Sequence, residues 1–168
     1  MNADALIARL APTPDVLDAL LAKLPDADWR WRPAEGGWSL IEVVNHLVDE
    51  EVEDFRARVR LVLEDATREW PPLDPEAIVT SRRYQERDPL ESLRRFRDER
   101  AVSLAWLRTL VAPKWETAKT HPSARTLTAG YLLASWTAHD ARHLQQIAKR
   151  LRGLAARDGA PWSVAYAG

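Results

Sequence analysis

The stretch SLIEVVNHLVDEEVEDFRARVRLV, residues 39–62, decides the fold that we expect for this chain. Its apolar residues recur in steps of three and four, which is the spacing of one buried face of an α-helix. That face consists of Leu40, Val44, Leu47, Val48, Val52, Phe55, Val59 and Val62. Ser39 and Glu42 form a capping box, in which the two residues satisfy each other's backbone amides at the helix start. The stretch therefore predicts a long amphipathic helix that ends before Pro71 and Pro72.

An earlier segment, from about Asp4 to Leu24, also shows helical periodicity but contains two breakers. Pro12 and Pro14 each lack an amide donor, so we expect them to interrupt the helix. Thr13 precedes Pro14 and is typical of a cap at which a helix restarts. This segment predicts a first helix in two parts.

Two later segments complete a set of four helices. One begins at Asp88, where a cap is followed by a first-turn proline, and Pro113 stops it. The other runs from roughly Thr128 to Leu151, with Gly153 as its C-terminal cap. No segment alternates with period two over a useful length, so we expect no sheet. Amphipathic helices bury their apolar faces most simply on one another, which predicts an all-α four-helix bundle in a single domain, residues 1–168.

The connection between the second and third helices, WPPLDPEAIVTSRRY at residues 70–84, is long for a compact bundle, and we expect a functional or surface-wrapping loop there. The chain also has eight tryptophans. We expect Trp38, Trp106 and Trp136 to pack between helices, because large aromatic rings contribute most to cores. The remaining five fall in the predicted connections and tail.

Charge and composition exclude several classes of function. The formal net charge is −1, so the protein has no long-range field that would attract nucleic acid. The arginine-rich stretch 94–100 is interrupted by acidic residues, which favours an ion-paired, solvated helix face. That stretch contains Arg94, Arg95, Arg97 and Arg100. There is also no glycine-rich phosphate loop and no G-x-S-x-G motif, so nucleotide hydrolysis and serine hydrolysis have no support.

Nothing in the sequence predicts export or membrane insertion. The first residues, MNADALIARLAPTPD, lack the basic start and unbroken apolar run of a secretory signal. No stretch approaches the roughly 20 apolar residues of a membrane span. We therefore expect a cytoplasmic protein with no membrane partner. Cysteine is absent as well, so any bound metal must have nitrogen and oxygen ligands.

The motif HDARH, residues 139–143, carries the most chemical information in the chain. Residues four apart on an α-helix differ by about 40° in direction and about 6 Å in rise, so the imidazoles of His139 and His143 reach the same point. Both fall beside Leu132, Trp136 and Ile147, on the face that we expect to be buried. Such a pair indicates either a metal site or two hydrogen-bonded histidines at the edge of the core.

His46, on the predicted second helix, is the candidate for a third ligand. Three neutral imidazoles with an open fourth position are typical of catalytic rather than structural sites. Asp49 and Glu50 follow one helical turn later and are the candidates for proton transfer or for orienting an imidazole. Asp140 and Gln146 are weaker candidates for support, and His121 lies in a predicted loop, where we expect it to be exposed.

Two runs of the sequence resemble helices of a known family. GGWSLIEVVNHLVDEE, residues 36–51, resembles the second helix of the DinB/YfiT-like superfamily, and SWTAHDARHLQQIAKRL, residues 135–151, resembles its fourth. The likeness extends through ARLAPTPDVLDALLAKLP and WRPAEGGWS, and the spacing between these motifs also fits. This superfamily is distinct from the DNA polymerase of similar name.

The resemblance implies both a topology and a ligand set. It implies an up-down-down-up bundle, whose long crossover would be the loop around Pro71 to Tyr84, and frequently a homodimer. It implies one divalent metal ion, most often nickel or zinc, held by His46, His139 and His143. Relatives include transferases and isomerases that use low-molecular-weight thiols, which implies a small-molecule substrate.

Two functions of different classes follow as hypotheses. The first is a metal-dependent enzyme, either a thiol-dependent S-transferase or a hydrolase, with Asp49 or Glu50 handling protons. The second is a non-catalytic, stress-associated binding or scaffold protein whose metal is structural or adventitious. The two differ in whether removing the metal abolishes a turnover or only lowers stability.

Overall fold

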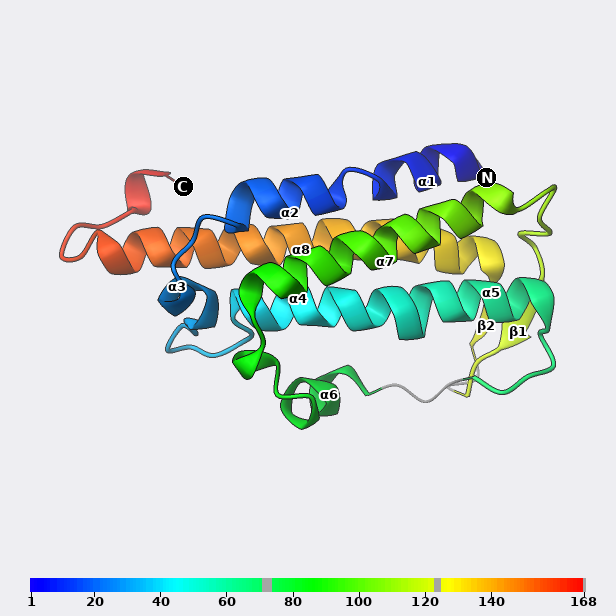
Figure 1. Ribbon diagram of the computed structural model, residues 1–168, viewed down its shortest axis with the longest axis horizontal. Helices are drawn as coiled ribbons and strands as arrows, with labels where there is room; N and C mark the ends of the chain where they lie inside the picture. Colours follow the sequence, from blue (N-terminus) through cyan, green and yellow to red (C-terminus); the bar gives the residue numbers. More distant parts are fainter. Residues whose placement is uncertain (71–73, 123–124, 168) are drawn as a thin grey trace.

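The computed structural model describes residues 1–70, 74–122 and 125–167. Among these residues, four long helical units lie side by side along the longest axis of the molecule (Figure 1). In that view the first and last units run from right to left, and the second and third run from left to right. The bundle predicted from the four amphipathic segments is therefore confirmed. None of the described helices is long and apolar enough to cross a membrane.

The first unit consists of α1, Ala3–Leu10, and α2, Thr13–Leu21. The break at Pro12 and Pro14 is confirmed, but Thr13 is not the cap: Pro12 occupies that position, and Thr13 is the first helical residue. The Thr13 hydroxyl is buried and donates to Asp140 Oδ2 at 2.7 Å. The prediction failed because a long-range partner was available to this hydroxyl, which the local sequence does not reveal.

The second unit is not one uniform α-helix. It consists of α4, Leu40–Asp49, a π-helical segment η1, Glu50–Arg56, and α5, Ala57–Glu64. The capping box is confirmed, since the Ser39 amide donates to Glu42 Oε2 at 2.8 Å. In a π-helix a residue lies over the one five positions earlier, so Phe55 follows the direction of Glu50. Pro71 and Pro72, expected to end this unit, lie outside the described residues.

The connection to the third unit contains structure that the sequence analysis missed. Helix α6, Pro75–Ser81, forms within the predicted loop, and its cap Asp74 accepts from the Ala77 amide at 3.1 Å. A 3₁₀ turn, η2, follows at Tyr84–Glu86. Figure 1 shows α6 near the end of the bundle where α4 begins, and α6 contacts α4. The segment predicted to be a loop thus contains a helix in this part of the connection.

The third and fourth units are α7, Pro89–Thr109, and α8, Ala129–Asp158. The predicted cap at Asp88 is confirmed, because its side chain accepts from the Glu91 amide at 2.8 Å. Helix α8 extends seven residues beyond the predicted end at Leu151, and its C-terminal cap is Gly159 rather than Gly153. A short helix, α3, Asp26–Arg30, precedes the second unit, and a 3₁₀ turn, η3, Ala165–Ala167, follows α8.

A small antiparallel hairpin corrects the expectation of no sheet. Strand β1, Ala118–Thr120, pairs with β2, Thr126–Thr128, at the end of the bundle where α8 begins. Three-residue strands are too short for alternation to stand out in a sequence. The hairpin leads directly into α8, whose N-terminus is capped by the Thr128 hydroxyl accepting from the Tyr131 amide at 3.0 Å.

Apolar side chains form two separate clusters inside the bundle. One lies around α2, α4 and the start of α7 and includes Leu17, Val48, Phe96 and Ile147. The other lies around α1, α5 and the start of α8 and includes Leu10, Phe55, Leu104 and Trp136. Trp29, expected in a connection, is only 1% exposed and belongs to the first cluster.

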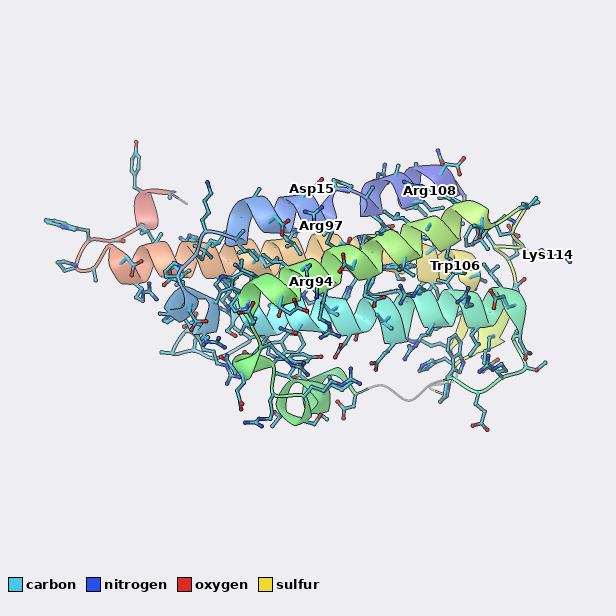
Figure 2. All side chains as sticks on the ribbon, in the orientation of Figure 1. Asp15, Arg94, Arg97, Trp106, Arg108 and Lys114 are labelled. Carbon is cyan, nitrogen blue, oxygen red and sulfur yellow. The ribbon has the colours of Figure 1, made fainter. Side chains whose placement is uncertain are left out.

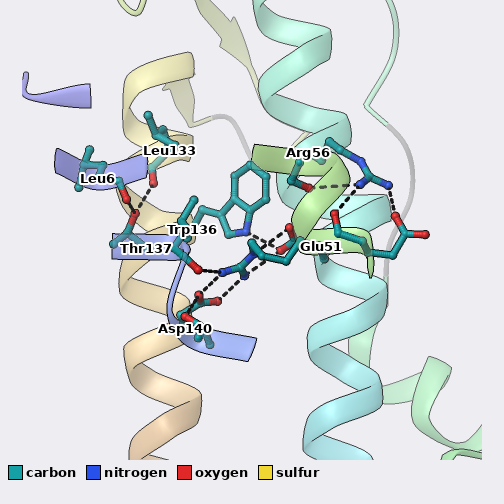
Figure 3. A network of polar contacts seen from close by, with 12 residues as sticks. Leu6, Glu51, Arg56, Leu133, Trp136, Thr137 and Asp140 are labelled. Atoms are coloured by element: carbon teal, nitrogen blue, oxygen red, sulfur yellow. Dashed lines mark hydrogen bonds and ion pairs between the residues drawn. The ribbon is translucent and has the colours of Figure 1, made fainter. Parts of the chain in front are cut away.

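A buried polar layer lies between the two clusters, and each helical unit contributes a charged or hydroxyl side chain to it. These residues are Thr13, Glu51, Arg100 and Asp140. Figure 3 shows Glu51, Trp136 and Asp140 converging on this layer. The Arg100 guanidinium donates to both carboxylates and to the Leu10 carbonyl, and Trp136 Nε1 donates to Glu51 at 2.9 Å.

Arg100 therefore corrects the interpretation of residues 94–100 as a solvated face. Its side chain is 1% exposed, whereas Arg94 and Arg97 are on the surface, as Figure 2 shows, and pair with acidic residues. The prediction holds for those two residues. It failed for Arg100 because the acidic partners of this residue come from other helices.

Candidate metal centre

The site predicted from three histidines is assembled from two helices that lie side by side. His46 is in the last turn of α4, and His139 and His143 occupy successive turns of α8. The Nε2 atom of His139 lies 3.3 Å from that of His46 and 3.0 Å from that of His143. One ring nitrogen from each residue lies within 4.8 Å of the other two. The structure thus brings together all three residues that the sequence analysis singled out as ligands.

The Nδ1 atoms of His143 and His46 face side-chain oxygen atoms. Gln146 Oε1 lies 2.8 Å from His143 Nδ1, and Glu50 Oε1 lies 3.8 Å from His46 Nδ1. An acceptor at Nδ1 favours the tautomer in which Nδ1 carries the proton and Nε2 carries the lone pair. Gln146 therefore orients His143 in the way proposed for it as a supporting residue, with its lone pair directed at the other two rings.

Burial keeps the imidazoles neutral. It is the main cause that lowers the pKa of His46 to about 3 and the pKa of His139 to about 2. Burial also lowers the pKa of His143. Neutral imidazole is the form that binds metal ions, so the three rings need lose no proton to act as ligands near neutral pH.

The three histidines open into a cavity of about 390 Å³. Its described lining consists of Gly37, Trp38, His46, Glu50, Glu76, His139, Arg142, His143 and Gln146. The Trp38 ring lies 4.7 Å from the His46 ring and stacks parallel to the His143 ring at 6.5 Å. Trp38, expected as a packing residue, thus forms an aromatic wall of the cavity. A cavity of this size suits a small molecule.

Glu50 is the carboxyl group beside the histidines. Burial, reinforced by the neighbouring Asp54, raises the pKa of Glu50 to about 8. The side chain is 8% exposed and lines the cavity. A carboxyl group with a pKa near neutrality exchanges protons readily, which is the property required of a general acid or base.

Asp49 occupies a different environment. Its carboxylate accepts from Arg82 Nη1 at 2.6 Å and from the Tyr84 hydroxyl, so it holds the connecting segment against α4. It is not among the described lining residues of the cavity. Asp140 likewise faces the buried polar layer, and His121 packs near Trp70, with ring centroids 5.4 Å apart.

Three contributors to the site escaped the sequence analysis. Arg142 stands inside the HDARH motif, but the motif gives no sign that this side chain lines the cavity. Glu76 comes from α6, which the sequence analysis treated as loop. Arg150 donates to the Trp38 carbonyl at 2.6 Å and thereby fixes the loop that carries the aromatic wall.

The donor set fits a divalent ion. Three Nε2 atoms point at one another, yet an N···N hydrogen bond requires a proton on one member of each pair. Because Gln146 favours a proton on the opposite nitrogen of His143, the group is poorly satisfied by internal hydrogen bonds alone. A cation bound by the three lone pairs satisfies all of them, and imidazole nitrogens suit zinc and nickel.

The fold and the site together define a helical bundle whose three histidines, two buried and one half-buried, have the arrangement of a metal-ligand set. The family model of the DinB superfamily matches residues 9–147. The chain therefore belongs to the DinB superfamily, which confirms the resemblance stated from the two sequence runs.

Two comparisons with individual proteins agree with this assignment. The Bacillus subtilis (strain 168) protein named "Putative metal-dependent hydrolase YfiT" is 26% identical over 152 residues, which cover 88% of this chain and 85% of that protein. A solved structure of YfiT from Bacillus subtilis, described as "a probable metal-dependent hydrolase with an unusual four-helix bundle topology", has a TM-score of 0.82. Its identity is 25%, and the match covers 91% of this chain and 87% of that chain.

Proposed function

We propose that this protein is a hydrolase that depends on one divalent metal ion held by His46, His139 and His143. The observation that carries the proposal is the convergence of three imidazole nitrogens in the lining of one cavity. Three ligands leave a coordination position open, as in catalytic rather than structural sites. The name of the Bacillus subtilis relative favours hydrolysis over the thiol-dependent S-transferase alternative.

The ion would be zinc or nickel, and when bound it supplies Lewis acidity that polarises a substrate oxygen and promotes the ionisation of water. The protein's own residues do the rest. Gln146 holds His143 in the ligating tautomer, and Trp38 excludes water from one side of the cavity. Glu50 accepts the proton of the attacking water and returns it to the leaving group. Glu50 would act as the base in its ionised form, which a bound cation would stabilise.

The first experiment is element-resolved metal analysis of the untagged protein and its single alanine variants. We expect about one equivalent of zinc or nickel in the parent protein, and its loss in His46→Ala, His139→Ala and His143→Ala. His121→Ala is the matched control, because it also removes one imidazole but lies outside the site. A parent protein without stoichiometric metal would refute the proposal.

The second experiment separates catalysis from metal binding. The metal-loaded protein is assayed against chromogenic carboxylic esters, anilides and phosphate esters. We expect turnover that disappears in Glu50→Gln while the metal content stays unchanged, since this variant removes the proton acceptor and keeps every histidine. Metal without any turnover would instead support the non-catalytic binding alternative.

A further inference from the structure

Arg142 differs from the arginines around it on α8. Arg150 is bonded to the Trp38 carbonyl, and Arg157 pairs with Asp28 and Asp158. Arg142 lines the cavity and is exposed, and within the described residues it has no hydrogen bond or ion pair. Its guanidinium is therefore available to a molecule that enters the cavity.

The position of Arg142 is electrostatically unfavourable for the site alone. This residue precedes His143 on α8 and lines the same cavity as all three histidines. A positive charge in the same cavity opposes the binding of a cation by these rings. A negative group that approaches both the ion and the guanidinium offsets this cost.

The summed charge of the metal-loaded cavity also favours an anionic ligand. Neutral imidazoles leave the double charge of a divalent ion intact. The described lining contains two carboxyl groups, Glu50 and Glu76, which at most offset that charge. Arg142 then gives the loaded cavity a net positive charge. A charged, concave site of this kind concentrates ligands of the opposite sign.

Building on the metal-dependent hydrolase proposed above, we propose that Arg142 is a specificity-determining residue that binds an oxyanion group of the substrate, a carboxylate or a phosphate. A guanidinium matches two oxygens of such a group with parallel N–H donors, and these charge-assisted hydrogen bonds are the strong ones. The substrate is then a small anionic molecule whose scissile bond lies at the histidines and whose anionic group lies at Arg142.

The test is calorimetric binding of two probes, succinate and inorganic phosphate, to the metal-loaded protein. We expect the parent to bind at least one probe and Arg142→Gln to bind that probe at least about tenfold more weakly. Arg142→Lys keeps the charge but loses the paired donors, so its affinity should be intermediate. The probe whose binding depends on Arg142 identifies the group as a carboxylate or a phosphate.

Arg108→Gln is the matched control, because it makes the same charge change at an exposed arginine outside this cavity, beside α1 (Figure 2). A second readout requires no anion: Arg142→Gln should bind the metal ion more tightly than the parent does, and Arg108→Gln should not. This difference should shrink as salt is added.

The outcomes distinguish the two proposals. A parent protein that takes up no metal overturns the hydrolase proposal and this inference with it. A parent that takes up metal but binds neither probe, or an Arg142→Gln variant that binds as tightly as Arg108→Gln, overturns the inference and leaves the metal site standing.

Discussion

Replacing Arg100 with methionine tests the role of the buried polar layer. The guanidinium makes five hydrogen bonds of 2.6 to 3.0 Å, two to Glu51, two to Asp140 and one to the Leu10 carbonyl. Methionine fills most of the volume but makes none of these bonds. Two carboxylates that are 1% and 6% exposed then lose their positive partner.

The expected loss follows from that arrangement. Removing one partner of a buried ion pair costs about 3–5 kcal/mol, because a charge remains buried without compensation. Each carboxylate keeps one neutral donor, from Trp136 or Thr13, which places the expectation near the lower end, at about 3 kcal/mol. For a chain of this size the melting temperature should fall by roughly 6–12 °C.

Urea unfolding at pH 7 in the presence of a chelator measures the effect without a contribution from metal binding. Arg94→Met is the control, because Arg94 is 59% exposed and its ion pairs lie on the surface. That variant should lose less than about 1 kcal/mol. Equal and small losses in Arg94→Met and Arg100→Met would refute the reasoning.

A third variant isolates the cause of the loss. Adding Glu51→Gln and Asp140→Asn to Arg100→Met removes the two uncompensated charges. Replacing a whole buried ionic cluster by neutral groups costs much less than breaking it, so this triple variant should recover part of the lost stability. No recovery would mean that packing, rather than charge, determines the effect of Arg100.

Four further predictions concern the site and the helix ends. Gly37→Ala should destabilise the protein more than Gly36→Ala: both have positive φ, but only at Gly37 would a Cβ lie 2.5 Å from Arg150. Gln146→Ala should weaken metal binding about 10- to 100-fold in a competition titration, without unfolding the protein. Asp88→Ala should cost about 1 kcal/mol in urea unfolding through loss of the α7 cap. The metal-free protein should lose stability as pH falls below about 6.5, because the histidines of the unfolded chain then bind protons while the buried histidines stay neutral. The free energy of unfolding should fall by up to about 1.4 kcal/mol per pH unit for each histidine.

Glu50 opposes this dependence of stability on pH. Glu50 has a raised pKa of about 8, so its contribution to stability is present below about pH 4.5 and is lost as pH rises toward 8. Between pH 4.5 and 6.5 the two histidines with pKa values of about 3 and 2, His46 and His139, together outweigh one carboxyl group, and the lowered pKa of His143 adds to them, so the net slope remains positive. Stability of the metal-free protein that rises on acidification through this range would contradict the lowered pKa of the histidines.

Local signals in the sequence predicted the helices well. The capping box at Ser39 and the cap at Asp88 depend on residues within one turn, and both are found where the sequence places them. The pairing of His139 with His143 is fixed by helical geometry alone. These features need no knowledge of the rest of the chain.

Features that depend on tertiary partners could not be predicted in this way. Asp49 and Glu50 are equivalent candidates in the sequence, yet only Glu50 lines the cavity, because adjacent residues on a helix differ by about 100° in direction. Arg100 resembles its neighbours in a charged helix, and its partners are Glu51 and Asp140 of other helices. Arg142 gains its setting in the same way, because residues outside α8, among them His46, Glu76 and Trp38, complete the cavity that it lines.

The π-helical segment between α4 and α5 has a consequence for the comparison of this chain with its relatives. A π-helical turn contains one more residue than an α-helical turn, while the α-helices on either side keep their direction. A relative with one residue fewer between His46 and Val59 would therefore keep His46 toward the cavity and Val59 in the core. Numbering offsets of one in this interval are compatible with an unchanged site, and an alignment of the superfamily should allow a single-residue gap there.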